Sequence, residues 1–239
     1  MLPQLSPFDG VLLIDKPAGC TSHDVVDRIR RHFGFKKVGH CGTLDPNATG
    51  LLMIVLERAT KLQDKLMADD KTYEGWMRLG IATDSQDVDG EVLAEKPVPA
   101  LTAADLEPVL AKFRGDIQQI PPMVSAIKHE GQPLYKLARK GKTVEREPRA
   151  LHIFDLRILS MDLPRVQLRV TCSKGTYVRT LCHDIGEQLG CGAHLAELRR
   201  TRSGKFDVKD AKTMQELLVL NRTQLQPYII PVMKLIQTS

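Results

Sequence analysis

The stretch "KTYEGWMRLGI" (residues 71–81) decides the fold, because its side chains alternate in character along the chain. One face carries Tyr73, Gly75, Met77, Leu79 and Ile81, and the other carries Glu74, Trp76 and Arg78. A period of two residues is typical of a strand with one buried face. We therefore predict a half-buried β-strand over residues 71–81.

The stretch "RVQLRVTCS" (165–173) alternates in the same way. Strands with clean alternation favour antiparallel pairing, with helices covering one face of the sheet. The chain shows no regular strand–helix–strand rhythm, no G-x-G-x-x-G motif and no P-loop. The predicted fold class is therefore α+β, with a mixed, mostly antiparallel central sheet flanked by helices.

Other segments add elements around these two strands. "VLLIDKP" (11–17) reads as a short strand, and the helix that follows it has Ser22 as its expected N-cap. Residues 50–67 begin as a buried segment and become an amphipathic helix. Residues 102–115 form a predicted helix capped by Thr102, and residues 176–190 form another.

The acidic stretch "TDSQDVDGEV" (83–92) invites a calcium interpretation, which the register excludes. With Gly90 at the sixth position of an EF-hand loop, the first ligand is Ser85 and the twelfth is Lys96. A lysine cannot supply the bidentate carboxylate that the twelfth position requires. The stretch is predicted to be a polar turn between strands.

The charge of the chain is unevenly distributed. The net charge is +5 with a pI near 8.9, and basic residues concentrate in three runs, at 30–37, 136–149 and 199–205. Any one run is compatible with an ordinary solvated face. Three separate runs in a basic chain favour a polyanionic partner.

Five cysteines, without disulfide-rich spacing, indicate a reducing compartment. Cys182, His183, Cys191 and His194 lie close together, but adjacent Cys182 and His183 point to different faces of a helix, unlike paired zinc ligands. Buried thiols are the better interpretation, and we expect no metal. No secretory signal is recognisable, and no apolar run approaches the roughly 20 residues of a membrane span. The expected location is the cytoplasm.

A single carboxylate stands out in "HCGTLDPNATGLL" (40–52), where Asp45 precedes a proline between Gly42 and Gly50. One interpretation is a turn or capping aspartate, which is a common role. The other is a reactive group, because glycines allow a ligand to approach closely and an apolar anchor follows the loop.

Arg179 and Tyr73 are two further candidates with open alternatives. Arg179 is either a surface arginine or the partner that keeps Asp45 ionised and oriented, if the fold brings the two together. Tyr73 is either a core residue of its strand or a ring on which a base stacks.

Taken together, these segments resemble the bacterial TruB-type tRNA pseudouridine synthases. The resemblance extends to about residue 208 and rests on "VGHCGTLDPNATGLL", "KTYEGWMRLGIATDSQDVDGEV" and "SKGTYVRTLCHDIGEQLGCGAHLAELRRTRSG", with "GVLLIDKPAGCTSHDVV" and "IPPMVSAIKHEGQPLYKLARKGKTVEREPR". It implies the pseudouridine synthase fold and isomerisation of uridine 55 in the tRNA T-loop to pseudouridine.

The resemblance also implies roles for individual residues. Asp45 corresponds to the nucleophilic aspartate, Tyr73 to the tyrosine that stacks on the flipped uracil and helps to remove its C5 proton, and Arg179 to the arginine paired with the aspartate. His40, Tyr177 and Leu198 correspond to residues that line the nucleotide pocket. The reaction is redox-neutral and implies no cofactor and no metal.

The domain organisation follows from the same resemblance. Residues 1–208 are expected to form the catalytic domain, with a thumb-like insertion at about 122–149 that grips the T-loop. Residues 209–239 are expected to be a short tail without a complete PUA domain. The expected partner is the tRNA T-arm, with no membrane, no obligatory protein partner and a monomeric state. Glu57 and Val124 depart from the family, which commonly has glycine and tyrosine there.

A binding module is the competing hypothesis: an RNA chaperone on the same scaffold that folds tRNA without modifying it. RNA affinity fits both hypotheses, so only chemistry distinguishes them. A binder has no need of the set formed by Asp45, Tyr73 and Arg179.

Overall fold

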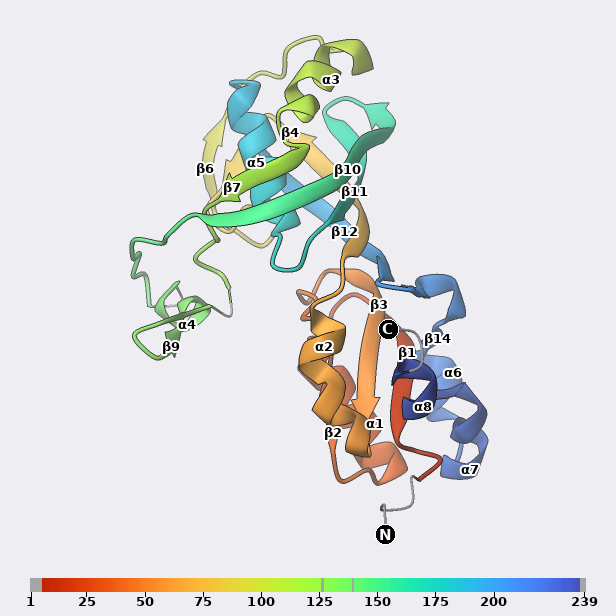
Figure 1. Ribbon diagram of the computed structural model, residues 1–239. Helices are drawn as coiled ribbons and strands as arrows, with labels where there is room; N and C mark the ends of the chain where they lie inside the picture. Colours follow the sequence, from red (N-terminus) through yellow and green to blue (C-terminus); the bar gives the residue numbers. More distant parts are fainter. Residues whose placement is uncertain (1–5, 126, 139, 237–239) are drawn as a thin grey trace. The chain divides into compact units, whose positions relative to one another are not determined.

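The computed structural model describes residues 6–125, 127–138 and 140–236, and the chain divides into two compact units (Figure 1). Unit 1 comprises the residues up to Tyr73 and those from Leu198 onward, and unit 2 comprises Glu74–Glu197. Strands β4 (Lys71–Leu79) and β12 (Ala193–Ser203) contribute residues to both units.

Unit 1 is built from the two ends of the chain. Its first segment contains β1 (Gly10–Lys16), α1 (Ser22–Phe33), β2 (Val38–His40), β3 (Thr49–Leu56), the 3-10 helix η1 (Glu57–Leu62) and α2 (Gln63–Met67). Its second contains β13 (Phe206–Asp207), η2 (Val208–Asp210), β14 (Lys212–Thr213), α6 (Met214–Leu218), α7 (Arg222–Leu225), η3 (Gln226–Tyr228), β15 (Ile229–Pro231) and α8 (Val232–Ile236). Strand β1 lies between β3 and the late strands β14 and β15, so the two segments share one sheet.

Strand β3 is the centre of unit 1 because both of its faces are buried. Leu52, Ile54 and Leu56 pack into one apolar cluster with the buried face of α1. The alternate residues Leu51, Met53 and Val55 pack into a second cluster on the opposite face. A strand that is covered on both sides reads as a continuous apolar run, which is what residues 51–56 show. The predicted buried segment is confirmed.

Helix α1 is confirmed, with a correction at its start. The N-cap is Thr21, whose hydroxyl accepts from the Asp24 amide while the Asp24 carboxylate accepts from the Thr21 amide, a reciprocal capping box. The expected cap, Ser22, lies inside the helix with its side chain buried. Two adjacent hydroxyl residues left this choice open to sequence reasoning.

Unit 2 contains the alternating strands. Its elements are β5 (Ile81–Thr83), β6 (Val92–Glu95), α3 (Ala103–Ala111), β7 (Gly115–Gln119), β8 (Lys128–His129), β9 (Gln132–Pro133), α4 (Leu134–Ala138), β10 (Arg149–Asp162), β11 (Arg165–Cys172) and α5 (Val178–Gln188). The strand order is β12-β4-β11-β10-β7, and β10 pairs antiparallel with both of its neighbours.

The alternation in β4 and β11 is confirmed by burial. Gly75, Met77 and Leu79 are buried in β4, and every second residue of β11 is buried. Thr102 caps α3 as expected, but the helix ends at Ala111, because the chain turns to begin β7 at Gly115. The acidic stretch connects β5 to β6, as predicted for a turn between strands.

The predicted α+β class with a mixed, mostly antiparallel sheet is confirmed. In the large sheet β1 pairs in parallel with β14, and β3 with β12. The antiparallel pairs are β1–β15, β1–β3, β2–β3, β10–β11, β10–β7 and β12–β13. Within the described residues, no helix combines the length and apolar character needed to cross a membrane.

Candidate active site

Asp45 lies in a loop of unit 1 that we call the Asp45 loop (residues 41–48), directly before β3. The residue is half-buried, and its carbonyl accepts from the amide of Ala48 at 3.1 Å, which closes the turn. The neighbouring Leu44 and Ala48 are buried in the α1-facing cluster. The loop is therefore anchored on both sides of Asp45, while Asp45 itself stays partly exposed.

Ser22 joins this loop to helix α1. Its buried hydroxyl accepts from the Leu44 amide at 2.9 Å and donates to the Leu44 carbonyl at 3.1 Å. One side chain thus satisfies both backbone groups of the residue that precedes Asp45. A buried backbone group without a partner is costly, so these bonds fix the loop geometry.

Lys16, at the end of β1, holds the other side of the loop. Its side chain is fully buried, and Nζ donates to the carbonyls of Pro17, Cys20 and Pro46 at 2.9, 2.7 and 3.0 Å. Burial lowers the pKa of Lys16, while the charges of Cys20 and Asp45 oppose that shift. The Lys16 ammonium group therefore attracts the Asp45 carboxylate electrostatically, in addition to its hydrogen bonds to the backbone carbonyls.

Arg200, in β12, is the third brace. It is 1% exposed, and its guanidinium donates to the carbonyls of Leu51 at 2.7 Å and Gly42 at 3.0 Å. Gly50 allows this strand to approach, because a Cβ atom there would lie 2.3 Å from the Arg200 carbonyl oxygen. Arg199 pairs through both guanidinium nitrogens with Asp15 of β1 at 3.0 and 2.7 Å. The first two arginines of the basic run 199–205 therefore bind groups within unit 1 and do not form a solvated basic face.

His40, Tyr73 and Leu198 also belong to unit 1. Tyr73 and Leu198 are partly buried and pack against the same apolar cluster as Leu44 and Ala48, so both predicted residues share one cluster with the anchors of the Asp45 loop. His40 lies in β2, in register with Ile54. Burial, with smaller contributions from the charges of Arg200 and His23, lowers the pKa of His40, which favours a neutral imidazole.

Arg179 and Tyr177 belong to unit 2, at the start of α5. Arg179 is 4% exposed and pairs with Asp87 at 3.2 Å, while its other nitrogen donates to the Val124 carbonyl at 2.8 Å. Tyr177 is held by the Gln119 amide, which accepts from its backbone N–H at 2.9 Å and donates to its carbonyl at 3.1 Å.

The acidic turn (residues 83–92) therefore does more than connect two strands, because its Asp87 pairs with the buried Arg179. The sequence interpretation missed this role. The only available signal was a carboxylate run of unexplained purpose at residues 83–92. The pairing of Asp45 with Arg179 joins residues of different units and stays a prediction.

The cysteines do not form a metal centre in the part of the chain that is described, where no cluster of three or more His, Cys, Asp or Glu side chains suited to a metal ion occurs. The expected burial of thiols holds for Cys41, Cys172, Cys182 and Cys191. Burial raises the pKa of Cys41 and of Cys182 to about 12, so both thiols are neutral at physiological pH.

Comparisons with known proteins extend over almost the whole chain. The model of the "TruB family pseudouridylate synthase (N terminal domain)" matches residues 30–178, and that of the "tRNA pseudouridylate synthase B C-terminal domain" matches residues 179–237. A relative from Opitutus terrae, named tRNA pseudouridine synthase B, is 50% identical over 97% of this chain and 96% of its own length. A relative of the same name from Chromohalobacter salexigens is 48% identical over 95% of this chain and 74% of its own.

Solved structures agree with this assignment. A chain in the crystal structure of a Cbf5–Nop10–Gar1 complex superposes with a TM-score of 0.74 at 31% identity, covering 94% of this chain. A chain in an H/ACA RNP bound to a substrate RNA containing 2′-deoxyuridine gives a TM-score of 0.67 at 31% identity, covering 89% of this chain. This chain spans 60% and 53% of those two chains. By its sequence, from residue 30 to residue 237, and by its fold, the protein is a member of the TruB family of pseudouridylate synthases.

Proposed function

We propose that this protein converts uridine 55 of the tRNA T-loop to pseudouridine, with Asp45 as the nucleophile. The observation that carries the proposal is the bracing of the Asp45 loop by Ser22, Lys16 and Arg200, which are all buried and come from three different elements. Three buried polar side chains form hydrogen bonds to this one short loop, which indicates that its carboxylate must be held in a defined position for the reaction.

The chemistry begins with extrusion of the uridine, which costs less from a loop than from a duplex. The Asp45 carboxylate attacks C1′ of the ribose, the C1′–N1 bond breaks, and its electron pair leaves with the uracil. The uracil rotates, C5 bonds to C1′, and Asp45 is released. C5 then loses its proton and N1 gains one. Elimination to a glycal is the alternative first step, and it leads to the same product.

The other predicted residues have roles around this step. Tyr73 stacks on the uracil and helps to remove the C5 proton, and His40, Tyr177 and Leu198 line the nucleotide pocket. Arg179 keeps Asp45 ionised. An arginine has five N–H donors, so the observed pairing with Asp87 is compatible with a second carboxylate.

The proposed substrate contact is the T-arm of tRNA. The segment 122–149 is the proposed thumb that grips the T-loop, and it carries the exposed residues Lys136, Lys140 and Lys142. We propose that the protein acts as a cytoplasmic monomer without an obligatory protein partner. Light scattering of the purified protein with and without tRNA tests the monomeric state.

A tritium-release assay tests the function against the binding-module hypothesis. tRNA labelled at C5 of its uridines is incubated with the protein, beside the same tRNA with cytidine at position 55. Formation of pseudouridine releases the C5 tritium, so we expect release only from the tRNA with uridine 55. Binding without release would favour the RNA chaperone.

A further inference from the structure

Left-handed backbone at residues other than glycine marks places where local contacts outweigh strain. In the part of the chain that the structure describes, these residues are Glu57 with a φ of +50°, Gln86 with +66° and Glu130 with +49°. Side chains rarely adopt this conformation, because it brings Cβ too close to the following carbonyl oxygen. The strain persists only where the surroundings impose it, so each position needs a local cause.

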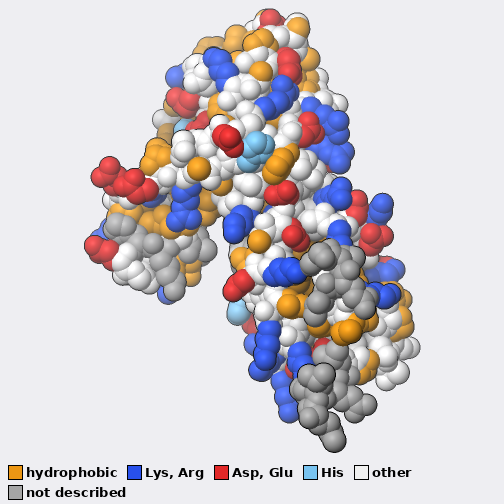
Figure 2. All heavy atoms as spheres, viewed as in Figure 1, with side chains coloured by type: hydrophobic (Ala, Val, Ile, Leu, Met, Phe, Trp, Pro, Cys, Tyr) orange, Lys and Arg blue, Asp and Glu red, His pale blue; other side chains and the backbone are white. Residues whose placement is uncertain are grey.

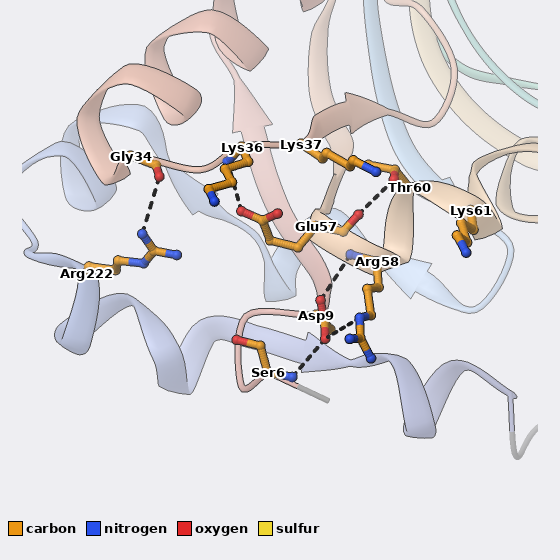
Figure 3. Close-up of a pocket in the computed structure, with 10 residues that line it drawn as sticks. All are labelled: Ser6, Asp9, Gly34, Lys36, Lys37, Glu57, Arg58, Thr60, Lys61 and Arg222. Carbon is orange, nitrogen blue, oxygen red and sulfur yellow. Dashed lines mark hydrogen bonds and ion pairs between the residues drawn. The ribbon is translucent and has the colours of Figure 1, made fainter. Parts of the chain in front are cut away.

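Two of the three residues have a simple cause. Glu130 and Gly131 form the two-residue turn between β8 and β9, and hairpin turns of that length favour positive φ. Glu57 lies in unit 1 near β2, where Lys and Arg side chains gather on the surface (Figure 2), and it lines the cavity of Figure 3. Its amide donates to the Lys37 carbonyl at 2.8 Å, and its carboxylate accepts from the Lys36 amide at 2.9 Å. Contacts with the loop before β2 thus account for its conformation.

Gln86 differs, because its polar groups bind three separate parts of unit 2. Its amide donates to the carbonyl of Thr83 in β5 at 3.2 Å. Its carbonyl accepts from the amide of Leu195 in β12 at 3.0 Å. Its side-chain Oε1 accepts from the hydroxyl of Thr180 in α5 at 2.7 Å. Gln86 therefore joins the acidic turn to a strand and to the helix that carries Arg179.

The hydrogen bond between Thr180 and Gln86 is largely shielded from water. Thr180 is 3% exposed, and Gln86 is half-buried. A buried polar atom that loses its partner is costly, so each group holds the other in place. Thr180 is the third residue of α5 and directly follows Arg179 in the chain. The bond therefore fixes the end of the helix from which the arginine extends.

Asp87, the partner of Arg179, directly follows Gln86 and is held within the same turn. Its Oδ1 accepts from the Ser85 hydroxyl at 2.5 Å and from the Asp89 amide at 3.1 Å. Its Oδ2 accepts from the Arg179 guanidinium at 3.2 Å. Gln86 is therefore connected to both members of this ion pair: it precedes the aspartate in the chain, and it binds the residue next to the arginine.

The side chain of Gln86 is itself informative. A glycine would adopt this φ without strain, and its amide and carbonyl could form the same two backbone hydrogen bonds. It would offer no acceptor to Thr180. A glutamine at a position that disfavours every side chain indicates that the bond to Thr180 outweighs the strain.

We propose that Gln86 and Thr180 are positioning residues for Arg179, and that their hydrogen bond sets the place of its guanidinium in the complex with tRNA. This rests on the proposed function, in which Arg179 acts on Asp45. A guanidinium acts on a carboxylate through N–H groups of fixed direction, so a small displacement of the start of α5 weakens that action. Both residues act through the arginine and not on the nucleotide.

The test measures single-turnover tritium release by the full chain, with the protein in excess over tRNA and at saturating concentration. Thr180→Val keeps the shape of the side chain and removes the hydroxyl. Thr180→Ser is the matched variant, because it keeps the hydroxyl and removes the methyl group. We expect the rate constant to fall at least about fivefold in Thr180→Val and to stay within about twofold of wild type in Thr180→Ser. The affinity for tRNA should be unchanged in both.

A merely structural role would not change this rate constant. At saturating concentration the tRNA reacts in its complex with folded protein, so a variant that is only less stable keeps the wild-type rate constant and shows its loss in urea unfolding. Gln86→Gly supplies a second variant, because it relieves the strained backbone while it removes the acceptor. We expect its rate constant to fall as much as that of Thr180→Val.

The double variant of Thr180→Val with Gln86→Gly shows whether the two residues act as one unit. Groups that act only through their mutual bond give a double variant no slower than either single variant. The proposal is overturned if Thr180→Val reacts with the wild-type rate constant, or if the two losses multiply in the double variant. Absent tritium release by the wild-type protein would instead count against the proposed function.

Discussion

At the scale of single residues, the candidate site depends on side chains that form hydrogen bonds to the backbone of the Asp45 loop and not to the substrate. Asp45 itself was recognisable in the sequence, because a carboxylate between two glycines precedes an apolar run. Ser22, Lys16 and Arg200 were not, since nothing local in their surroundings shows that they reach carbonyls and amides of a distant loop. Burial of a polar side chain becomes visible only when the fold is known.

The substitution Ser22→Ala tests this bracing. It leaves the Leu44 amide and carbonyl without their side-chain partner, and we expect a loss of about 1–3 kcal/mol in the free energy of unfolding. The catalytic rate should fall at least about tenfold, since a small displacement of a reactive group is costly. Thr21→Ala is the matched control: it removes the helix cap at about 1 kcal/mol and spares Leu44. Equal loss of activity in both variants would contradict the bracing role.

A pH dependence of stability follows from His40, whose pKa is lowered mainly by burial. Between that lowered pKa and the ordinary value of about 6.5, the unfolded chain binds a proton that the folded chain does not. Stability should therefore fall as the pH falls through this window. Urea unfolding from about pH 7.5 to about pH 5 measures it. In His40→Asn this part of the decline should disappear; an identical pH profile in the variant would refute the assignment.

At the scale of elements, the alternating strands and the first helix were readable, because their periodicity is local. Thr102 caps α3 as expected, whereas its early end at Ala111 was missed, since the sequence carries an apolar pattern beyond the turn. The partners of the strands were not readable. Alternation shows that β4 has a buried face, but nothing in it indicates that β12 lies beside β3.

The contact between β3 and β12 depends on Gly50. Its φ is +98°, and an added Cβ would lie 2.3 Å from the Arg200 carbonyl oxygen, so Gly50→Ala must separate the two strands. We expect a loss of more than about 3 kcal/mol in the free energy of unfolding. Gly19→Ala, at φ +80° with nothing within 4 Å of the added atom, should lose only about 1–2 kcal/mol. Similar losses in chemical denaturation would show that the close approach is unimportant.

The start of α5 depends in the same way on the acidic turn. Asp87→Asn removes the carboxylate that pairs at 3.2 Å with Arg179, whose side chain is 5% exposed, and the loss of this charge-assisted hydrogen bond should cost about 1.5–3 kcal/mol in the free energy of unfolding. The partly exposed pair of Glu74 with Arg169, 3.9 Å apart, is the control, and Glu74→Gln should change stability by less than about 1 kcal/mol. Both are measured by denaturant unfolding, and equal small effects would contradict a structural role for Asp87.

At the scale of the whole molecule, family membership was accessible from short motifs, and the comparisons confirm it. The compact units were not foreseen. Unit 1 combines residues up to Tyr73 with those from Leu198 onward, because β14 and β15 pair with β1 at the opposite end of the chain. Such pairing carries no local signal. The expected roles of the site residues and the domain boundary at residue 208 stay predictions.

The replacement Asp45→Asn tests the central claim most directly, because it preserves size and removes only the nucleophilic charge. The measurement is nucleoside analysis of tRNA after incubation, together with the affinity for tRNA. We predict unchanged affinity and no detectable pseudouridine from the variant, beside complete conversion by the wild-type protein. Pseudouridine formation at the wild-type rate by Asp45→Asn would contradict the account.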